Sequence, residues 1–172
     1  MERVTIQQFL QMMETSPAFD VRTPKEYQEG HIPGSINLPL FTNDERAIVG
    51  TIYKRSGREK AILAGLDIVG PKLRWLADSV RKRAKNGTAL IHCWRGGMRS
   101  ESVAWLVGYT GIKTIVLEKG YKAYRTWCIE RFSEERKIVI LSGRTGSGKT
   151  EILSHLGGLG EQTIDLEGIA HH

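Results

Sequence analysis

The segment Thr88–Arg99 reads TALIHCWRGGMR, and it decides the fold around it. Its first part, Thr88–His92, has the apolar character of a buried strand, and a helical pattern follows over Ser100–Tyr109. Cys93 therefore lies in a loop that joins a strand to a helix. Backbone N–H groups and the helix dipole favour negative charge at such a position. We expect Cys93 to ionise to a thiolate and to act as a nucleophile.

The loop after Cys93 has a composition suited to an anion. Gly96 and Gly97 allow the backbone to adopt positive φ and to curl its amides inward. Arg99 is expected to close this ring and to pair with an oxyanion, and Arg95 to face the incoming substrate. The alternative is that Cys93 is a buried structural thiol. The candidate anion-binding loop comprises Trp94, Arg95, Gly96, Gly97, Met98 and Arg99, with Cys93 as the candidate catalytic residue.

Strand and helix patterns alternate on both sides of this loop. Strands are predicted at Ala18–Val21, Ser35–Leu38, Thr88–His92, Lys113–Leu117, Lys137–Leu141 and Gln162–Leu166. Helices are predicted from Thr5, from Thr23, over Asn43–Arg58 and Ala61–Val69, from Pro71, over Ser100–Tyr109 and Tyr121–Phe132, and from Thr150 to Leu156. This alternation predicts an α/β fold with a mainly parallel sheet flanked by helices.

A polar stretch, Ser133–Arg136, is the predicted boundary between two domains, residues 1–132 and residues 133–172. The second segment is predicted to form a strand, a loop, a helix and a further strand, which is an incomplete βαβ unit. It is too short to bury a core of its own. It is therefore either the beginning of a longer domain or a tail that packs on the first domain.

The second segment contains a phosphate-binding loop motif. Gly143-Arg144-Thr145-Gly146-Ser147-Gly148-Lys149-Thr150 fits the P-loop pattern G-x-x-x-x-G-K-[ST], between a predicted strand and a predicted helix. Lys149 would add positive charge, and Thr150 is placed to bind Mg²⁺. A nucleotide-hydrolysing site needs a further acidic residue, for which Asp165 and Glu167 are the nearby candidates. Binding of a nucleotide with Mg²⁺ stays open, and its turnover by this chain is not expected.

The composition favours an acidic partner and a reducing compartment. The chain has 172 residues, a formal net charge of +6 and a pI near 9.4, which suits RNA or a phosphorylated small molecule. Two cysteines argue against a disulfide scaffold. We find no signal peptide and no apolar run near the ~18 residues of a membrane span, so a cytoplasmic location is expected. Basic side chains that would contact RNA phosphates, or would only be solvated, form two groups: Lys54, Arg55, Arg58 and Lys60, then Arg74, Arg81, Lys82, Arg83 and Lys85.

The string Asp20-Val21-Arg22, followed by GHIPGSINLP at residues 30–39, resembles the first motif of rhodanese-like sulfurtransferase domains. With Cys93 at a strand end and Gly120-Tyr121 further on, the resemblance covers roughly residues 5–130. The loop from Cys93 to Arg99 has seven residues, one more than in most rhodaneses. It is similar in length to the loop of the related cell-cycle phosphatases, which accommodates a phosphate-sized group. The resemblance therefore implies a tetrahedral oxyanion as ligand.

With the P-loop added, the chain resembles the bacterial tRNA 2-selenouridine synthases. The match rests on CWRGGMRS at 93–100, the insertion from Asn43 to Lys54, GRTGSGKT at 143–150 and DLEG at 165–168. Members are longer, so a truncated member is expected. The resemblance implies selenium transfer from selenophosphate to 2-thiouridine at the tRNA wobble position through Cys93. It also implies tRNA and a selenophosphate-producing enzyme as partners and geranyl diphosphate as a further candidate ligand. No tightly bound cofactor is expected, and no metal at Cys93.

Three other functions stay open from the residues alone. One is a plain rhodanese-type sulfurtransferase that carries a persulfide on Cys93. Another is a cysteine-based phosphatase, since the loop spacing suits a phosphocysteine intermediate, although the loop offers no acid to protonate the leaving group. The last is a catalytically silent module that binds tRNA without transfer.

Overall fold

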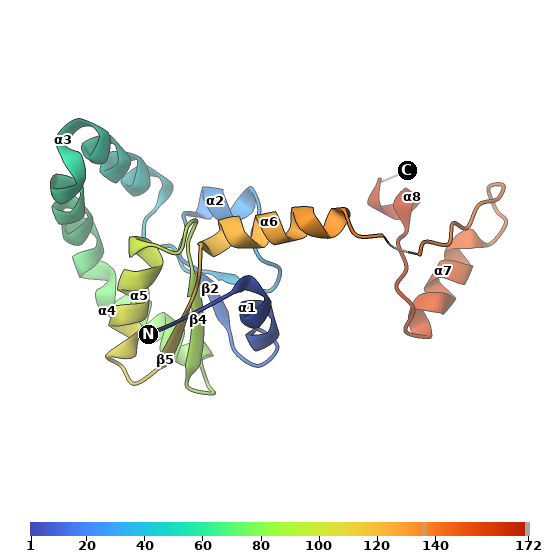
Figure 1. The fold of residues 1–172 in the computed structure, drawn as a ribbon, viewed down its shortest axis with the longest axis horizontal. Helices are drawn as coiled ribbons and strands as arrows, with labels where there is room; N and C mark the ends of the chain where they lie inside the picture. The colour runs from blue at the N-terminus through green and yellow to red at the C-terminus, as the bar shows by residue number, and fades with distance from the viewer. Residues whose placement is uncertain (136, 171–172) are drawn as a thin grey trace. The chain divides into compact units, whose positions relative to one another are not determined.

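The computed structural model describes residues 1–135 and 137–170 (Figure 1). Residue contacts divide the chain into two compact units, Met1–Ser133 and Glu134–His172, and each is described by itself. Arg136, which belongs to the predicted boundary, lies outside the described residues.

The first unit is built on a five-stranded sheet with the order β1-β5-β4-β2-β3, in which every pair of neighbours is parallel. The strands are β1 (Glu2–Val4), β2 (Ala18–Asp20), β3 (Ile36–Asn37), β4 (Thr88–His92) and β5 (Lys113–Leu117). The predicted parallel α/β fold is confirmed. The sequence patterns located β4 and β5 correctly and made β3 too long. They missed β1, because a three-residue strand is too short to show alternation.

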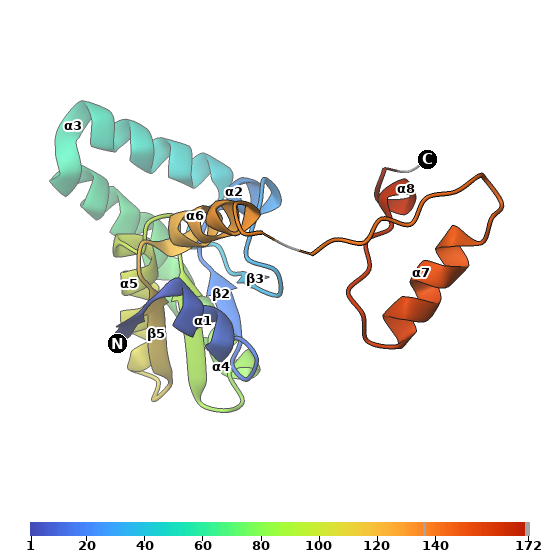
Figure 2. The same cartoon turned by 45° about the vertical axis from the view of Figure 1, so that its right-hand side comes forward.

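Helices cover both faces of this sheet (Figures 1 and 2). One core cluster joins the sheet to α1 and α6, and the other joins it to α3, α4 and α5. The helices of the unit are α1 (Ile6–Met12), α2 (Pro24–Gln28), α3 (Asn43–Val69), α4 (Leu73–Arg83), α5 (Met98–Gly108) and α6 (Gly120–Phe132), with a short 3₁₀ turn at Gly70–Lys72. Side chains that alternate along each strand supply both clusters, as a sheet buried on two faces requires.

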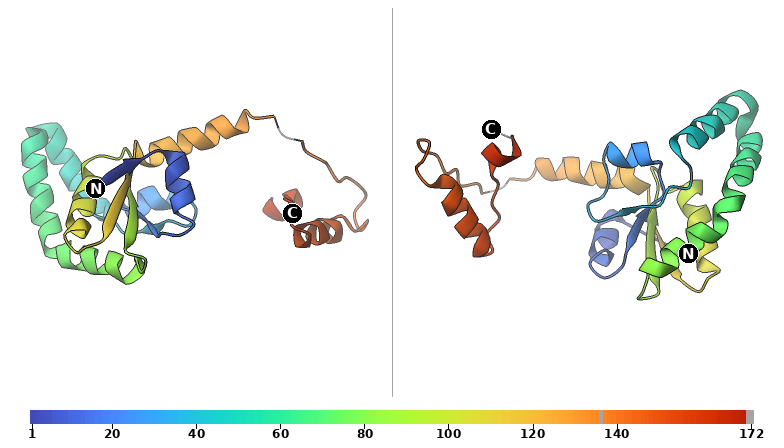
Figure 3. Two further views of the ribbon diagram at one scale, coloured as in Figure 1. Left: turned by 60° about the horizontal axis from the view of Figure 1, so that its bottom comes forward. Right: turned by 180° about the vertical axis from the view of Figure 1, so that it is seen from behind.

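The start of α3 and a bend within it follow from local sequence. Thr42 and Glu45 form a reciprocal capping box at its first turn. Gly57 then interrupts the helix with φ 86° and ψ 178°, a conformation that favours glycine. The helix bends there, as Figures 1 to 3 show. The bend lies one residue before the end of the first predicted helical run, Asn43–Arg58.

The direction of side chains in β4 separates the cysteine from the histidine before it. Ile91 and Cys93 belong to the cluster under α4 and α5, whereas Leu90 lies in the cluster with α1. His92 is fully buried, and its ring meets the Phe9 ring edge-on at 5.9 Å. His92 therefore faces away from Cys93, as alternation along the strand predicts.

Buried His92 is expected to make stability depend on pH. Burial lowers the pKa of His92 from 6.5 to about 4, and the nearby Asp20 offsets this only in part. Between these two values the unfolded chain binds a proton that the folded chain excludes, so stability falls as the pH falls through this window. We expect the free energy of unfolding to drop by about 2–3 kcal/mol between pH 7 and pH 4.5 on account of this group.

Urea titrations of the wild type and of His92→Leu at both pH values give the free energies of unfolding. The contribution of His92 is the difference between the losses of the two proteins on acidification. The variant should lose clearly less stability on acidification than the wild type. Equal losses in the two proteins would show that His92 does not carry the effect.

The second unit contains α7 (Lys149–Gly158) and α8 (Leu166–Ile169) and no strand among its described residues. The predicted helix after the P-loop is confirmed, but the predicted strands Lys137–Leu141 and Gln162–Leu166 are wrong. Ile138, Val139 and Ile140 are instead 77%, 91% and 83% exposed. A strand needs a neighbour to pair its N–H and C=O groups. The described part of this unit supplies none, so apolar sequence alone does not form the strand.

Candidate active site

The candidate site lies at the carboxyl ends of three neighbouring strands. Cys93 directly follows β4, which is flanked by β2 and β5. The loop then leads into α5, whose first residue is Met98. Ligands of parallel sheets bind in this position, because loops from several strands converge there.

Cys93 is buried, with 3% of its surface exposed. Its Sγ lies 3.3 Å from the Ser100 Oγ, which donates a hydrogen bond of 2.9 Å to the carbonyl oxygen of Gly97. The same carbonyl lies 4.0 Å from the sulfur. The first turn of α5 therefore positions the sulfur through one hydroxyl. The role of Ser100 could not be predicted from local spacing, since it depends on how the loop closes.

The loop is held against the turn between β5 and α6. The Tyr121 N–H donates to the Cys93 carbonyl at 2.8 Å, and the Lys122 N–H donates to the Trp94 carbonyl at 3.1 Å. Gly96 has φ 65°, and a side chain there would overlap the Leu117 carbonyl. The expectation of positive φ is therefore met at Gly96. It is wrong for the second glycine, Gly97, whose φ is −107°.

Gly120 makes the closest approach to this loop, and its replacement is expected to disturb it. Gly120 has φ 56°, and an added Cβ would overlap the Cys93 carbonyl and crowd the N–H of Gly96. Left-handed strain and overlap with rigid backbone together should lower the free energy of unfolding of Gly120→Ala by about 2–5 kcal/mol.

Gly111→Ala is the matched control for Gly120→Ala. Gly111 also has a positive φ, 85°, but nothing lies within 4 Å of its added Cβ. This variant should lose only about 1 kcal/mol, from strain alone. Equal losses measured by urea unfolding in the two variants would disprove the close packing of Gly120 on the loop.

Arg99 has a carboxylate partner that the sequence analysis missed. Its Nη1 and Nη2 donate to the Glu26 oxygens at 2.8 and 3.2 Å. Burial works to lower the pKa of Arg99, but the hydrogen bonds to Glu26 outweigh it and the pKa is raised. Burial likewise works to raise the pKa of Glu26, and Arg99 with the Thr23 N–H brings it below its usual range. The pair therefore stays charged, and the Arg99 side chain is fixed in place at the end of the cysteine loop.

A buried ion pair between Asp20 and Arg22 contacts the cysteine loop through Trp94. The Arg22 Nε lies 3.0 Å from both Asp20 carboxylate oxygens, and its Nη2 lies 2.6 Å from one of them and 2.7 Å from the Gly30 carbonyl. The guanidinium also lies 4.0 Å from the Tyr121 ring centroid and 5.7 Å from that of Trp94. Trp94 therefore packs in the protein through a cation–π contact. Asp20 and Arg22 are two positions apart in the sequence, and this spacing alone did not predict their ion pair.

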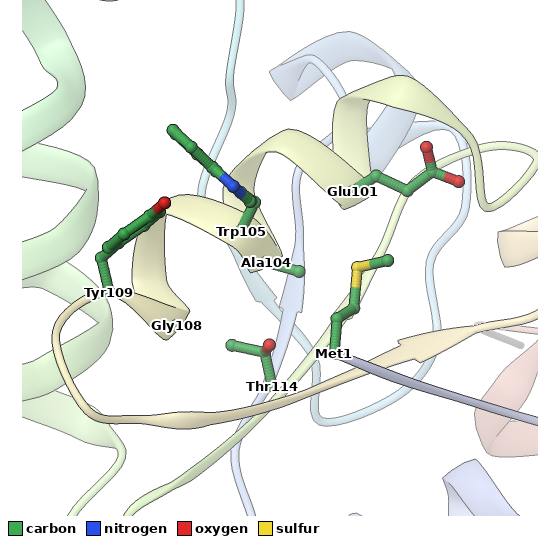
Figure 4. Close-up of a pocket in the computed structure, with 7 residues that line it drawn as sticks. All are labelled: Met1, Glu101, Ala104, Trp105, Gly108, Tyr109 and Thr114. Atoms are coloured by element: carbon green, nitrogen blue, oxygen red, sulfur yellow. The ribbon is translucent and has the colours of Figure 1, made fainter.

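A groove beside α5 reaches the cysteine loop, and a separate hollow on α5 does not. Arg95, Met98 and Arg99 help to line a groove of about 1120 Å³ between α3 and α5. The other hollow, of about 530 Å³, lies between α5, β5 and Met1, and no residue of the cysteine loop lines it (Figure 4). Arg95 is exposed, as a residue that meets an incoming ligand would be.

In the second unit, the P-loop residues form a turn that leads into α7. The Lys149 Nζ donates to the carbonyls of Gly143 and Arg144 at 3.1 and 3.2 Å, and Gly146 and Gly148 have φ 80° and 81°. Thr150 is the second residue of the helix. The Lys149 side chain therefore stabilises the turn by hydrogen bonds to its backbone carbonyls.

Asp165, the candidate acidic partner of the P-loop, has another role in this unit. It accepts a hydrogen bond of 3.0 Å from the Gly168 N–H and so caps α8. Within residues 1–135 and 137–170, the structure holds no group of three or more His, Cys, Asp or Glu side chains placed to bind a metal ion.

The protein has a parallel sheet with helices on both faces and a cysteine loop that follows its central strand. This is the architecture of rhodanese-like domains. The chain belongs to the rhodanese-like domain family, whose model matches residues 5–126. The tRNA 2-selenouridine synthase AAA domain model matches residues 136–172.

Curated relatives named tRNA 2-selenouridine synthase match almost the whole chain. Those from Nitrosomonas europaea, Proteus mirabilis and Bdellovibrio bacteriovorus are 37%, 40% and 41% identical to it, over 91% of its length in each case. The chain spans 42–43% of the length of these three relatives. The resemblance to this group that the sequence predicts is confirmed.

Solved structures agree with the fold assignment. The N-terminal domain of a protein described as ATP/GTP binding, from Clostridium difficile 630, is 39% identical with a TM-score of 0.65, over 74% of this chain and 99% of that one. The reduced Bacillus anthracis CoADR-RHD is 24% identical with a TM-score of 0.50, over 76% of this chain and 17% of that one, and shows the fold alone. Among the described residues, no helix has both the length and the apolar character to cross a membrane.

Proposed function

We propose that this chain takes part in tRNA selenation, with selenophosphate as the selenium donor, 2-thiouridine at the wobble position as the acceptor, and Cys93 as the residue that takes up selenium from the donor. In this proposal tRNA is the acceptor, selenophosphate is the co-substrate, and the reaction is cytoplasmic. The names of the relatives support the reaction class. The chemistry of the Cys93 loop supports the role of the sulfur.

One observation carries the proposal: the backbone amides of the loop after Cys93 have no hydrogen-bond acceptor in the protein. Within the described residues, no hydrogen bond has the N–H of residues 94–99 as its donor. The N–H groups of residues 94–99, in the loop and the first turn of α5, therefore have no protein acceptor among the described residues. Amides at a helix start favour an oxyanion, and the guanidinium of Arg99 is held at this helix start by Glu26. Selenophosphate is a tetrahedral oxyanion that carries its selenium on phosphorus, so amides that hold its oxygens would present the selenium to Cys93.

Two reactions at Cys93 differ in what they leave on the sulfur. Attack of the thiolate on selenium forms an S–Se bond and breaks the Se–P bond, whose electron pair leaves on phosphorus as phosphite. Attack on phosphorus breaks the same bond with the pair on selenium, so that selenide leaves and a phosphocysteine remains. The first is rhodanese-type transfer, and the second is phosphatase-type chemistry.

Mass spectrometry of the Cys93 peptide separates these reactions after incubation with selenophosphate or, in parallel, with thiosulfate. We expect the peptide to gain one selenium atom from selenophosphate, while the Cys128 peptide of the same digest stays unchanged. A phosphoryl group on Cys93 would instead assign a cysteine-based phosphatase. Sulfur from thiosulfate with nothing from selenophosphate would assign a plain sulfurtransferase. An unmodified Cys93 in both reactions would leave a binding module.

The roles of the remaining ligands are proposed on less direct grounds. The P-loop turn offers Lys149 and Thr150 to a phosphate group with Mg²⁺, and the resemblance adds geranyl diphosphate as a candidate ligand. A selenophosphate-producing enzyme would supply the donor. Each can be checked by equilibrium binding to the chain, with Lys149→Ala as the variant for the P-loop.

A further inference from the structure

The groove between α3 and α5 opens beside the cysteine loop, since Arg95, Met98 and Arg99 help to line it. Its lining is mostly apolar, with Val49, Leu66 and Leu106 among the side chains. We call it the α3–α5 groove. An apolar groove of about 1120 Å³ on the surface of a domain indicates a binding site.

The charged side chains that line this groove all have one sign. They are Arg46, Lys54, Arg58, Arg95 and Arg99, and no Asp or Glu lines the groove within the described part of the chain. Arg99 is paired with Glu26. The other four form no ion pair with any described carboxylate. The positive charge of the groove is therefore not neutralised by the protein, which favours binding of an anionic partner.

These cations are spread along the groove. Arg46, Gly50 and Lys54 recur at the spacing of one helix face, so they share the side of α3 that lines the groove. Arg46 and Lys54 are eight positions apart, which places them about 12 Å apart along the helix axis. Arg58 follows the bend, and its Nη2 lies 3.9 Å from the Met98 Sδ beside the cysteine loop. The positive charge thus extends from α3 to the loop.

Two exposed aromatic side chains also line the groove. Tyr53 is 58% exposed on α3, and Trp105 is 63% exposed on α5, where Figure 4 shows it next to Tyr109. Exposed aromatic rings among cations are the pattern that binds single-stranded nucleic acid, because bases stack on the rings while phosphates contact the cations.

We propose that the α3–α5 groove binds a single-stranded segment of RNA and leads it to the Cys93 loop. This rests on the proposed function, in which the acceptor is an RNA base. A polyanion can engage all four unpaired cations, whereas one phosphate group cannot span their separation. A second copy of the chain would bring like charge against like charge, since each copy has a net charge of +6.

The basic face of α4 is the alternative RNA surface and supplies matched controls. Arg81 and Lys82 are exposed there but do not line the groove. Trp75, also on α4, is 51% exposed and lies outside the groove as well. On each surface, one lysine, one arginine and one tryptophan can therefore be replaced by alanine. The groove variants and the control variants then lose the same kinds of side chain.

Fluorescence anisotropy with a labelled anticodon stem–loop RNA, at several salt concentrations and without selenophosphate, tests the proposal. Lys54→Ala/Arg58→Ala should weaken binding about tenfold and reduce the slope of log K against log salt by about 1.4, since two phosphate contacts are lost. Trp105→Ala should weaken binding at least about fivefold. Arg81→Ala/Lys82→Ala and Trp75→Ala should change the affinity less than about twofold.

Equal losses in the groove and control variants would overturn the proposal, as would RNA that fails to bind the wild-type chain. Geranyl diphosphate binding that depends on Lys54 and Arg58, without RNA binding, would reassign the groove to a small amphiphile. A dimer that sedimentation shows to be lost in Lys54→Ala/Arg58→Ala, with unchanged RNA affinity, would reassign it to a second copy. RNA binding is measured without selenophosphate, and modification of Cys93 by selenophosphate is measured without RNA. The groove proposal and the proposed role of Cys93 can therefore be disproved independently.

Discussion

Cys93→Ser is expected to abolish selenium and sulfur transfer, by about 10³-fold or more, while the fold is retained. A serine hydroxyl is a far weaker nucleophile than a thiolate, and it cannot carry a chalcogen atom as a persulfide or a selenium analogue does. The replacement oxygen still lies near the Ser100 hydroxyl, which approaches the present sulfur to 3.3 Å. The position therefore keeps a polar neighbour.

The measurement is transfer from selenophosphate or thiosulfate to an acceptor, alongside thermal unfolding of the same samples. Cys128→Ser is the control, because Cys128 lies in α6, outside the cysteine loop. It should retain transfer. If Cys93→Ser retained full transfer with an unchanged melting temperature, the assignment of Cys93 as the reacting group would be wrong.

Asp20→Ala is expected to produce the largest loss of stability, about 3–5 kcal/mol. Asp20 and Arg22 both have fully buried side chains. Removing the carboxylate leaves the guanidinium charge buried without its counter-ion, held by the Gly30 carbonyl and two aromatic rings. Since Trp94 contacts this guanidinium, the cysteine loop should loosen together with the core.

Urea unfolding measures this loss, and two further variants make it specific. Asp20→Asn/Arg22→Met removes both charges and should recover much of the stability, because no unpaired charge remains. Asp78→Ala breaks the exposed Arg74–Asp78 pair and should change stability by less than about 0.5 kcal/mol. A loss in Asp20→Ala no larger than that of the exposed pair would contradict the role given to the buried one.

The fold of the first unit could be predicted where local patterns are strong. The strand Thr88–His92, the loop after it and the strand Lys113–Leu117 all agree with the structure, because a buried parallel strand reads as a short apolar run. The capping boxes at Thr5 and Thr23 also fixed two helix starts. These signals are contained within a few residues of chain.

The supports of the site could not be predicted, because they join distant positions. Glu26 and Arg99 are 73 residues apart, and Glu26 showed only its capping role in the sequence. The approach of Gly120 to the Cys93 carbonyl depends on the turn after β5. Such contacts depend on how the strands are ordered, and no local spacing encodes that order.

The second unit shows the opposite error, in which a local pattern was trusted too far. Lys137–Leu141 is apolar enough for a strand, and the P-loop motif calls for one before it. Strand formation is a property of a pair, however, and a partner is missing from the described residues of this unit. The turn at Gly143–Thr150 and α7 form without it, because their stabilising contacts are local.

We expect the amides after Cys93 to hold a tetrahedral anion against its sulfur. Alkylation of the native chain by iodoacetamide, with and without inorganic phosphate, tests it, because both cysteines report from one sample. We expect phosphate to slow the modification of Cys93 in a saturable manner and to leave Cys128 unaffected. Phosphate that changes neither rate, or both rates equally, would contradict the claim.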